Sequence, residues 1–243
     1  MRLSKAWIIA SKDFGTFFKR KSILYTIVWF ELVVSIGLPI IIHVIAGKPA
    51  AVALLPGFMN SFSFWYVIGA ALLPAGIASY SLVGEKVQKS LEPLLATPTI
   101  DEEILAGKSI AAFVPAMVST FIGASVFMAL VDIFTGRVLG RIAYPDWNIA
   151  IIVLLLTPLA CILSIGFNVL VSSRSNDVRV SQQVGMLIML PFGAVYLLSE
   201  FRVLSLTTDS LLTMTAVLAV VDVVLFWVVK TTFQREEILT RWK

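Results

Sequence analysis

Long apolar stretches alternate with short polar connections along the whole chain. Six of these stretches reach the roughly 20 residues that a helix needs to cross a bilayer. They cover residues 23–46, 61–83, 110–131, 149–171, 180–199 and 211–229. Because a soluble core does not need apolar runs of this length, the pattern predicts an all-α integral membrane protein. It would have six transmembrane helices in a single transmembrane domain, residues 1–243.

The fifth apolar stretch is the least regular. It opens on Ser181, Gln182 and Gln183 and carries Pro191 near its middle. Proline removes a helical hydrogen bond, so a kinked or partly re-entrant segment is expected here. Five complete spans therefore remain an alternative to six.

The segment before the first span, residues 1–21, has a helical period. Its apolar positions recur every three or four residues, at Leu3, Trp7, Ala10, Phe14 and Phe17. The lysines fall elsewhere on the helical wheel, which predicts an N-terminal amphipathic helix lying in the headgroup plane. This interfacial helix could be only an anchor, or it could also contact a cytoplasmic partner.

The composition supports the membrane class, and the distribution of positive charge predicts the orientation of the chain in the membrane. The mean hydropathy is +0.93, with 58% hydrophobic and 14% charged residues, as expected in a membrane protein. Fifteen of the 19 Lys and Arg residues lie before the first span, in the second and fourth connections, or in the tail. The positive-inside rule then places both termini in the cytoplasm, in a multi-pass protein of the cell membrane. The net charge of +4 describes one membrane face in contact with lipid, and it does not indicate a nucleic-acid partner.

The connection between the second and third spans, residues 84–108, is charged and able to form helix. Ser90 can cap a short helix that has Glu92 and Pro93 in its first turn, and Pro98 ends that helix. Such a segment could be a docking surface, or only a well-capped cytoplasmic loop.

A second helix is expected directly after this break. Thr99 and Glu102 have the spacing of a capping box, so the helix should begin there and run into the third span. Gly107, Lys108 and Ser109 spell the end of a phosphate-binding loop, but the earlier glycine of that motif is replaced by Glu102. Lys108 is better interpreted as a charge at the cytoplasmic interface.

The same connection carries a family resemblance. It resembles the cytoplasmic signature of permease subunits of the ABC type 2 export family, through LEPLLATP at residues 91–98 and the residues Glu85, Lys86, Glu103, Ile104, Leu105, Gly107 and Lys108. The resemblance implies a homodimer or heterodimer of permeases with two separate ATP-binding cassette subunits, which bind ATP and Mg. It also implies that residues 84–108 hold a cytoplasmic coupling helix. The residues expected to contact the ATPase are Glu85, Glu92, Leu94, Leu95, Thr97 and Pro98.

The function expected from this resemblance is export of an amphipathic or hydrophobic compound, such as a drug or lipid, with energy from the partner ATPases. The chain itself would not be an enzyme. One alternative is a membrane scaffold or sensor subunit driven by an ATPase without transport. Another is an intramembrane enzyme, which the single histidine and the absence of HExxH and GxSxG motifs disfavour.

Two acidic residues fall inside the apolar stretches. Glu31 in the first span and Asp222 in the sixth are costly in hydrocarbon and should face a protein interior or cavity. Their similar distances from the cytoplasmic boundary allow a shared site for a cation or cationic amphiphile. The alternative is that each is neutralised and serves only packing. With one histidine, His43, and one cysteine, Cys161, no metal site is predicted.

The remaining polar residues of the spans suggest helix contacts. Ser79, Ser164 and Asn168 are expected to hydrogen-bond between helices. Tyr144 and Trp147, in an outward connection, are expected to lie in the aromatic belt at the outer membrane interface.

Overall fold

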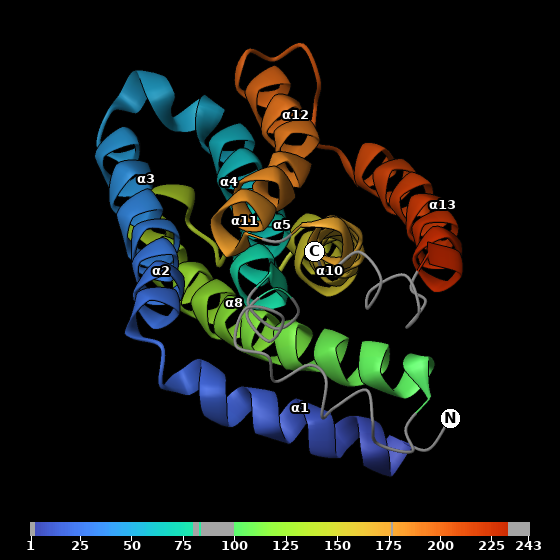
Figure 1. Ribbon diagram of the computed structural model, residues 1–243. Helices are drawn as coiled ribbons and strands as arrows, with labels where there is room; N and C mark the ends of the chain where they lie inside the picture. The colour runs from blue at the N-terminus through green and yellow to red at the C-terminus, as the bar shows by residue number, and fades with distance from the viewer. Residues whose placement is uncertain (1–2, 80–82, 84–99, 176, 233–243) are drawn as a thin grey trace.

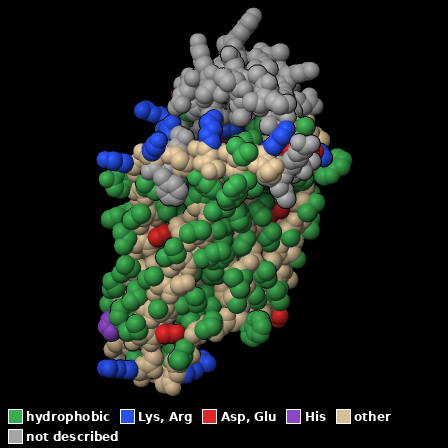
Figure 2. All heavy atoms as spheres, turned by 90° about the horizontal axis from the view of Figure 1, so that it is seen from below, with side chains coloured by type: hydrophobic (Ala, Val, Ile, Leu, Met, Phe, Trp, Pro, Cys, Tyr) green, Lys and Arg blue, Asp and Glu red, His purple; other side chains and the backbone are tan. Residues whose placement is uncertain are grey.

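The computed structural model describes residues 3–79, 83, 100–175 and 177–232. These residues are helical except for short connections. Six segments among them are long and apolar enough to cross a membrane: Lys21–Ala46, Val52–Ser79, Glu102–Leu139, Trp147–Arg174, Val178–Glu200 and Thr208–Thr232. Figure 2 shows the resulting band of hydrophobic side chains, with Lys and Arg gathered at its two ends. The predicted all-α fold is confirmed for the described residues, with six segments that could span a membrane.

Several spans contain more than one helical element. An N-terminal helix, α1 (Leu3–Phe18), precedes the first span, which comprises α2 (Lys21–Leu32), the π-helical η1 (Val33–Gly37) and α3 (Leu38–Ala46). The second comprises the end of the 3-10 turn η2 (Pro49–Leu54), α4 (Leu55–Ser63) and α5 (Trp65–Ser79), and the third is α8 (Asp101–Leu139). The fourth comprises α9 (Trp147–Ile151), the π-helical η4 (Ile152–Leu156) and α10 (Thr157–Arg174). The fifth comprises α11 (Val178–Met186), the 3-10 turn η5 (Leu187–Met189) and α12 (Leu190–Glu200), and the sixth is α13 (Thr208–Thr232).

The centre of the bundle is formed by α5 and α10. In Figure 1, α2 and α3 lie on one side of this pair and α13 lies on the other, while α8 and α1 cross below it in this view. Nearly every residue of α5 from Tyr66 to Ser79 is buried, and many of them are glycine or alanine. Small residues let helix backbones approach closely, which is the usual source of helix association in a bilayer.

Buried hydroxyl and amide groups join the central helices. The Ser79 hydroxyl donates to Asn168 Oδ1 at 3.3 Å, and Asn168 Nδ2 donates to the Ser164 carbonyl at 2.8 Å. The Ser164 hydroxyl donates to the Ala71 carbonyl at 2.6 Å, and the Ser181 hydroxyl donates to Ser79 at 3.3 Å. The predicted hydrogen bonds between helices are confirmed for Ser79, Ser164 and Asn168, and they link α5, α10 and α11.

The fifth span follows the second along its whole length. Ser181 meets Ser79 at one end, and the Ser199 hydroxyl lies 2.9 Å from the Ser61 hydroxyl at the other. The helix is interrupted by η5 just before Pro191, as the proline predicts. The fifth span is therefore long enough to cross a membrane and is broken in the middle.

The first helix packs on α8. Its buried face consists of Ala6, Ile9, Ala10 and Phe17, whereas Trp7 is 57% exposed. The predicted apolar face is therefore only partly right, because α1 buries one stripe against protein. α8 makes this possible because its 39 residues span about 58 Å, roughly twice the thickness of the hydrocarbon core.

Two ion pairs and one glycine fix this helix pair. Lys5 Nζ lies 3.9 Å from Glu103 Oε2, and Lys108 Nζ lies 3.7 Å from Asp13 Oδ2. A Cβ on Gly107 would lie only 2.7 Å from the carbonyl oxygen of Ala6. Lys108 is 3% exposed, so it is a buried contact between helices and not the interfacial charge expected from the sequence.

The start of α8 differs from the prediction by one residue. Ile100 precedes the first helical residue, and its backbone N–H donates to Glu103 Oε2 at 3.3 Å. Glu103 therefore completes the first turn in place of Glu102. Glu102 instead forms an ion pair of 2.9 Å with Lys230 of α13.

We expect Gly107→Ala to lower the free energy of unfolding by about 1–3 kcal/mol, because the new methyl group must push α1 away from α8. Gly136→Ala is the matched control in the same helix, since a Cβ there meets nothing within 4 Å. It should leave stability unchanged or raise it by up to about 1 kcal/mol through helix propensity. Denaturant unfolding of both variants in detergent micelles measures the difference, and equal effects would contradict the close α1 contact.

Candidate functional site

The coupling residues predicted from the sequence are Glu85, Glu92, Leu94, Leu95, Thr97 and Pro98, and all of them lie outside the described residues. The structure does place the two intramembrane carboxylates, Glu31 and Asp222. It also describes the helices that enter and leave the connection, α5 and α8.

Glu31 lies near the end of α2, against α8. The Ser35 hydroxyl donates to Glu31 Oε2 at 3.3 Å and lies 3.0 Å from the Tyr66 hydroxyl of α5. Since Ser35 has a single hydroxyl hydrogen, Tyr66 must donate to Ser35 when Ser35 donates to Glu31. Glu31 Oε1 is buried and has no hydrogen-bond partner among the described residues.

The backbone around Glu31 is adapted to this position. The π-helical turn η1 follows directly and carries Ser35, and π turns occur often at functional sites. On the facing helix, a Cβ at Gly123 would overlap the Glu31 carboxylate and lie 2.7 Å from Ser35 Oγ. The hydroxyls of Ser119 and Thr120 lie nearby. The Glu31 carboxylate thus occupies a polar recess beside Ser35, Ser119 and Thr120. The recess exists because Gly123 has no side chain.

A second tyrosine continues this polar and aromatic region toward the connection after α8. The Tyr144 hydroxyl donates to the Met59 carbonyl at 3.2 Å and lies 3.1 Å from the Ser63 hydroxyl. The ring of Phe127 lies between the two tyrosines, 5.8 Å from Tyr66 and 5.9 Å from Tyr144. Burial raises the pKa of Tyr144 far above its usual value, so the phenol remains a neutral hydrogen-bond donor.

The placement of Tyr144 in an aromatic belt is therefore wrong, because its side chain is buried. Asp132 of α8 holds the loop inward, since its Oδ1 accepts from the backbone N–H groups of Ala143 at 2.9 Å and Tyr144 at 3.0 Å. Trp147 is 80% exposed, as a belt residue would be. The contacts of Tyr144 with Ser63 and Met59 join positions 81 and 85 residues apart, which no local pattern indicates.

Asp222 of α13 has a different setting. It is buried, and neither carboxylate oxygen has a hydrogen-bond partner within the part of the chain that the structure describes. It lines a cavity of about 570 Å³ between α8, α10 and α13, together with apolar residues such as Phe113, Ile165 and Val169. The Lys230–Glu102 ion pair, in which both side chains are about half exposed, borders the same cavity.

The structure does not bring Glu31 and Asp222 together. Figure 1 shows α2 and α13 on opposite sides of the central α5 and α10. The shared site expected from their similar depths is therefore not formed within one chain. Each carboxylate has its own surroundings, hydroxyl groups for Glu31 and an apolar cavity for Asp222.

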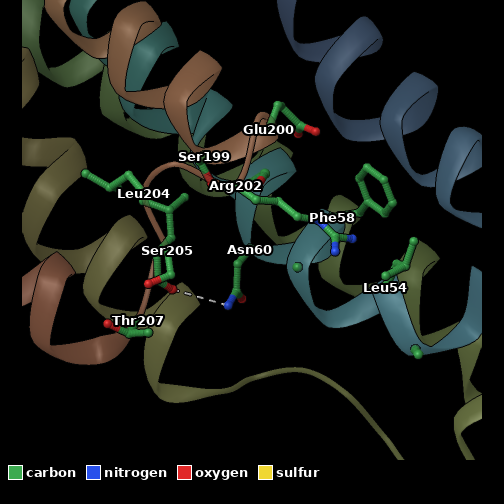
Figure 3. Close-up of a pocket in the computed structure, with 13 residues that line it drawn as sticks. Leu54, Phe58, Asn60, Ser199, Glu200, Arg202, Leu204, Ser205 and Thr207 are labelled. Atoms are coloured by element: carbon green, nitrogen blue, oxygen red, sulfur yellow. Dashed lines mark hydrogen bonds between the residues drawn. The ribbon is translucent and has the colours of Figure 1, made fainter.

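A pocket of about 400 Å³ with a mixed polar and apolar lining lies where the connection between α12 and α13 meets α4 (Figure 3). Asn60 Nδ2 donates to the Leu206 carbonyl at 3.4 Å, which holds this connection onto α4. Arg202, whose φ is 57°, extends its guanidinium toward Phe58 in the close-up. The sequence gives no signal for this pocket, because its walls come from connections far apart in the chain.

The two isolated candidate ligands do not form a metal site. Cys161 is fully buried in α10, and the His43 ring packs 4.8 Å from the Phe134 ring. Across the described ranges, no three His, Cys, Asp or Glu side chains come close enough to hold a metal ion.

Comparison with known proteins adds no relative. No protein-family model matches the chain, and no curated protein matches it.

We expect Gly123→Ala to displace the Glu31 carboxylate and to lower the free energy of unfolding by about 1–3 kcal/mol, because the new methyl group overlaps the recess that the carboxylate occupies. Gly193→Ala is the matched control in another span, where an added Cβ meets nothing within 4 Å. Unfolding of both variants in detergent gives the comparison. A Gly123→Ala protein as stable as the control would show that the recess beside Gly123 does not restrain Glu31.

Proposed function

We propose that the chain is the transmembrane permease subunit of an ATP-binding cassette exporter. The observation that carries the proposal is the LEPLLATP segment, residues 91–98, between the second and third spans of a six-span helical chain. Its resemblance to ABC type 2 permeases extends through Gly107 and Lys108 into α8. The protein would work as a homodimer or heterodimer with two ATPase subunits that bind ATP and Mg.

The proposed orientation in the membrane is based on the distribution of Lys and Arg residues. Both termini and the 84–108 connection would face the cytoplasm, because most Lys and Arg residues outside the spans lie in these segments. In this orientation α1 lies at the cytoplasmic interface of the cell membrane, and the exposed Trp7 and Ile8 contact the lipid.

The helices flanking the connection suggest how motion would be passed on. α8 is one continuous helix from Asp101, so displacement at its first turn would move the whole helix. α1 would move with it, because Gly107 and the pairs Lys5–Glu103 and Lys108–Asp13 tie the two helices together. Closure of the ATPases against the coupling helix would thus act as a rigid-body shift on α8 and α1.

The cargo class is supported by two apolar cavities along α13. One is the Asp222 cavity of about 570 Å³, and the other, of about 620 Å³, lies between α10, α12 and α13. Mainly apolar pockets with few polar groups are typical of sites for small organic ligands. An amphipathic or hydrophobic compound that enters from the lipid fits these surroundings.

The test is purification of the tagged chain from its native membrane, followed by identification of co-purifying subunits and measurement of ATPase activity. We expect a stoichiometric ATP-binding subunit with the unchanged chain. Leu94→Asp with Leu95→Asp should weaken this association at least tenfold, because buried apolar contacts dominate binding interfaces.

The matched control is Ile142→Asp with Val203→Asp. It introduces the same two charges at exposed apolar positions in connections at the other end of the bundle. This variant should retain the ATPase. A folded chain that purifies without any ATP-binding subunit would contradict the proposal, and a bound ATPase without cargo movement would favour the scaffold or sensor alternative.

A further inference from the structure

We propose that the cavity around Asp222 binds a lipophilic cation, with the carboxylate facing the positive charge. As the identification of a cargo site this rests on the proposed exporter function. The binding itself depends only on the described residues.

The cavity has the size and lining of a small-molecule site. Its volume of about 570 Å³ falls within the range of roughly 300–1,000 Å³ common for ligand pockets. Its walls come from three spans, with Phe113 on α8, Ile165 and Val169 on α10, and Leu225 and Val229 on α13. An aromatic or alkyl body would be surrounded by apolar side chains.

Asp222 defines the charge of the ligand. Its side chain lines the cavity, the residue is only 8% exposed, and both oxygens lack a hydrogen-bond partner within the described chain. A buried carboxylate without a partner is costly, and a bound cation would supply the missing interaction. The polar groups that join the central helices are satisfied, as the Ser79–Asn168–Ser164 hydrogen bonds illustrate. Among the described residues, Asp222 is the side chain with two buried oxygens that both lack a partner, whereas Glu31, Trp65 and Glu200 each have one such atom.

The other charges of the cavity cancel each other. Lys230 and Glu102 form an ion pair of 2.9 Å at the rim, where both are about half exposed. Asp222 is therefore the uncompensated charge among the described lining residues. A ligand with one positive charge complements this balance, and an anion does not.

The ligand would enter sideways, between helices. α13 exposes much of its apolar surface, including Phe226, which is 62% exposed and lines the cavity. On the inner side, Leu225 packs against Gly166, where an added Cβ would lie 2.9 Å from Leu225 Cδ2. Leu225 also lines the neighbouring apolar cavity of about 620 Å³, so this contact separates the two spaces.

The experiment uses the full chain in phosphatidylcholine nanodiscs without any ATPase. Binding of the tetraphenylphosphonium cation and of the tetraphenylborate anion is measured by equilibrium dialysis, because the two probes have the same shape and opposite charge. The uptake of each probe by empty nanodiscs of the same lipid is subtracted, because the bilayer itself takes up the anion more strongly. We expect the unchanged chain to bind the cation at least tenfold more tightly than the anion.

Asp222→Asn should raise the Kd for the cation at least tenfold and remove the charge preference, while Asp222→Glu should retain it. Asp209→Asn is the matched control, since it removes the same charge from an exposed position in the first turn of the same helix. Ala106→Phe should weaken binding of the cation by filling the cavity, because Ala106 forms part of its lining. Size-exclusion chromatography identifies any variant that does not fold.

The proposal is overturned if the unchanged chain does not prefer the cation, if Asp222→Asn binds it as tightly, or if Asp209→Asn has the same effect. Since no ATPase takes part, failure here leaves the co-purification test of the exporter function unaffected. Conversely, selective binding in a chain that recruits no ATPase would support the site and contradict the transport role.

Discussion

The structure depends on the fact that a bilayer core offers no water to polar groups. Backbone groups are satisfied within helices, and side-chain groups must find partners inside the bundle. Asn168 and the hydroxyls of Ser79, Ser164 and Ser181 meet this requirement and thereby fix α5, α10 and α11 against one another. Glu31 meets it in part through Ser35, whereas Asp222 does not. Asp222 is a buried carboxylate with no hydrogen-bond partner at either oxygen among the described residues, and it lines a cavity where a ligand can satisfy it.

The length of α8 determines where α1 lies. A helix nearly twice as long as the hydrocarbon core is thick must leave it, and its first turns become a platform for α1. The platform explains why Lys108 is buried against Asp13, although a lysine at a membrane interface would ordinarily extend to water. In the proposed transport cycle, this platform connects the coupling segment to the spans.

The spans could be predicted from the sequence because the lipid acts on each segment separately, so hydropathy and length suffice. The interruption of the fifth span was predictable for a similarly local reason, the ring of Pro191. The buried face of α1 could not be predicted in this way, because that face packs on α8 at Gly107 and does not contact lipid. The predicted position of Tyr144 in the aromatic belt was wrong because its hydroxyl contacts Ser63 and Met59, which are far away in the chain. Glu31 and Asp222 were recognisable as costly charges, but their separation depends on the order in which the helices pack, which hydropathy does not encode.

The central claim is that the 84–108 connection faces the ATP-containing side of the membrane, at the end of the bundle opposite the connection after α8. Its most direct test is labelling of single cysteines in intact cells with a membrane-impermeant maleimide. Cys161 is replaced by alanine, and cysteine is introduced by Ser90→Cys or Ile142→Cys. The account predicts labelling at position 142 in intact cells and at position 90 only after permeabilisation. Labelling of position 90 from outside would contradict it.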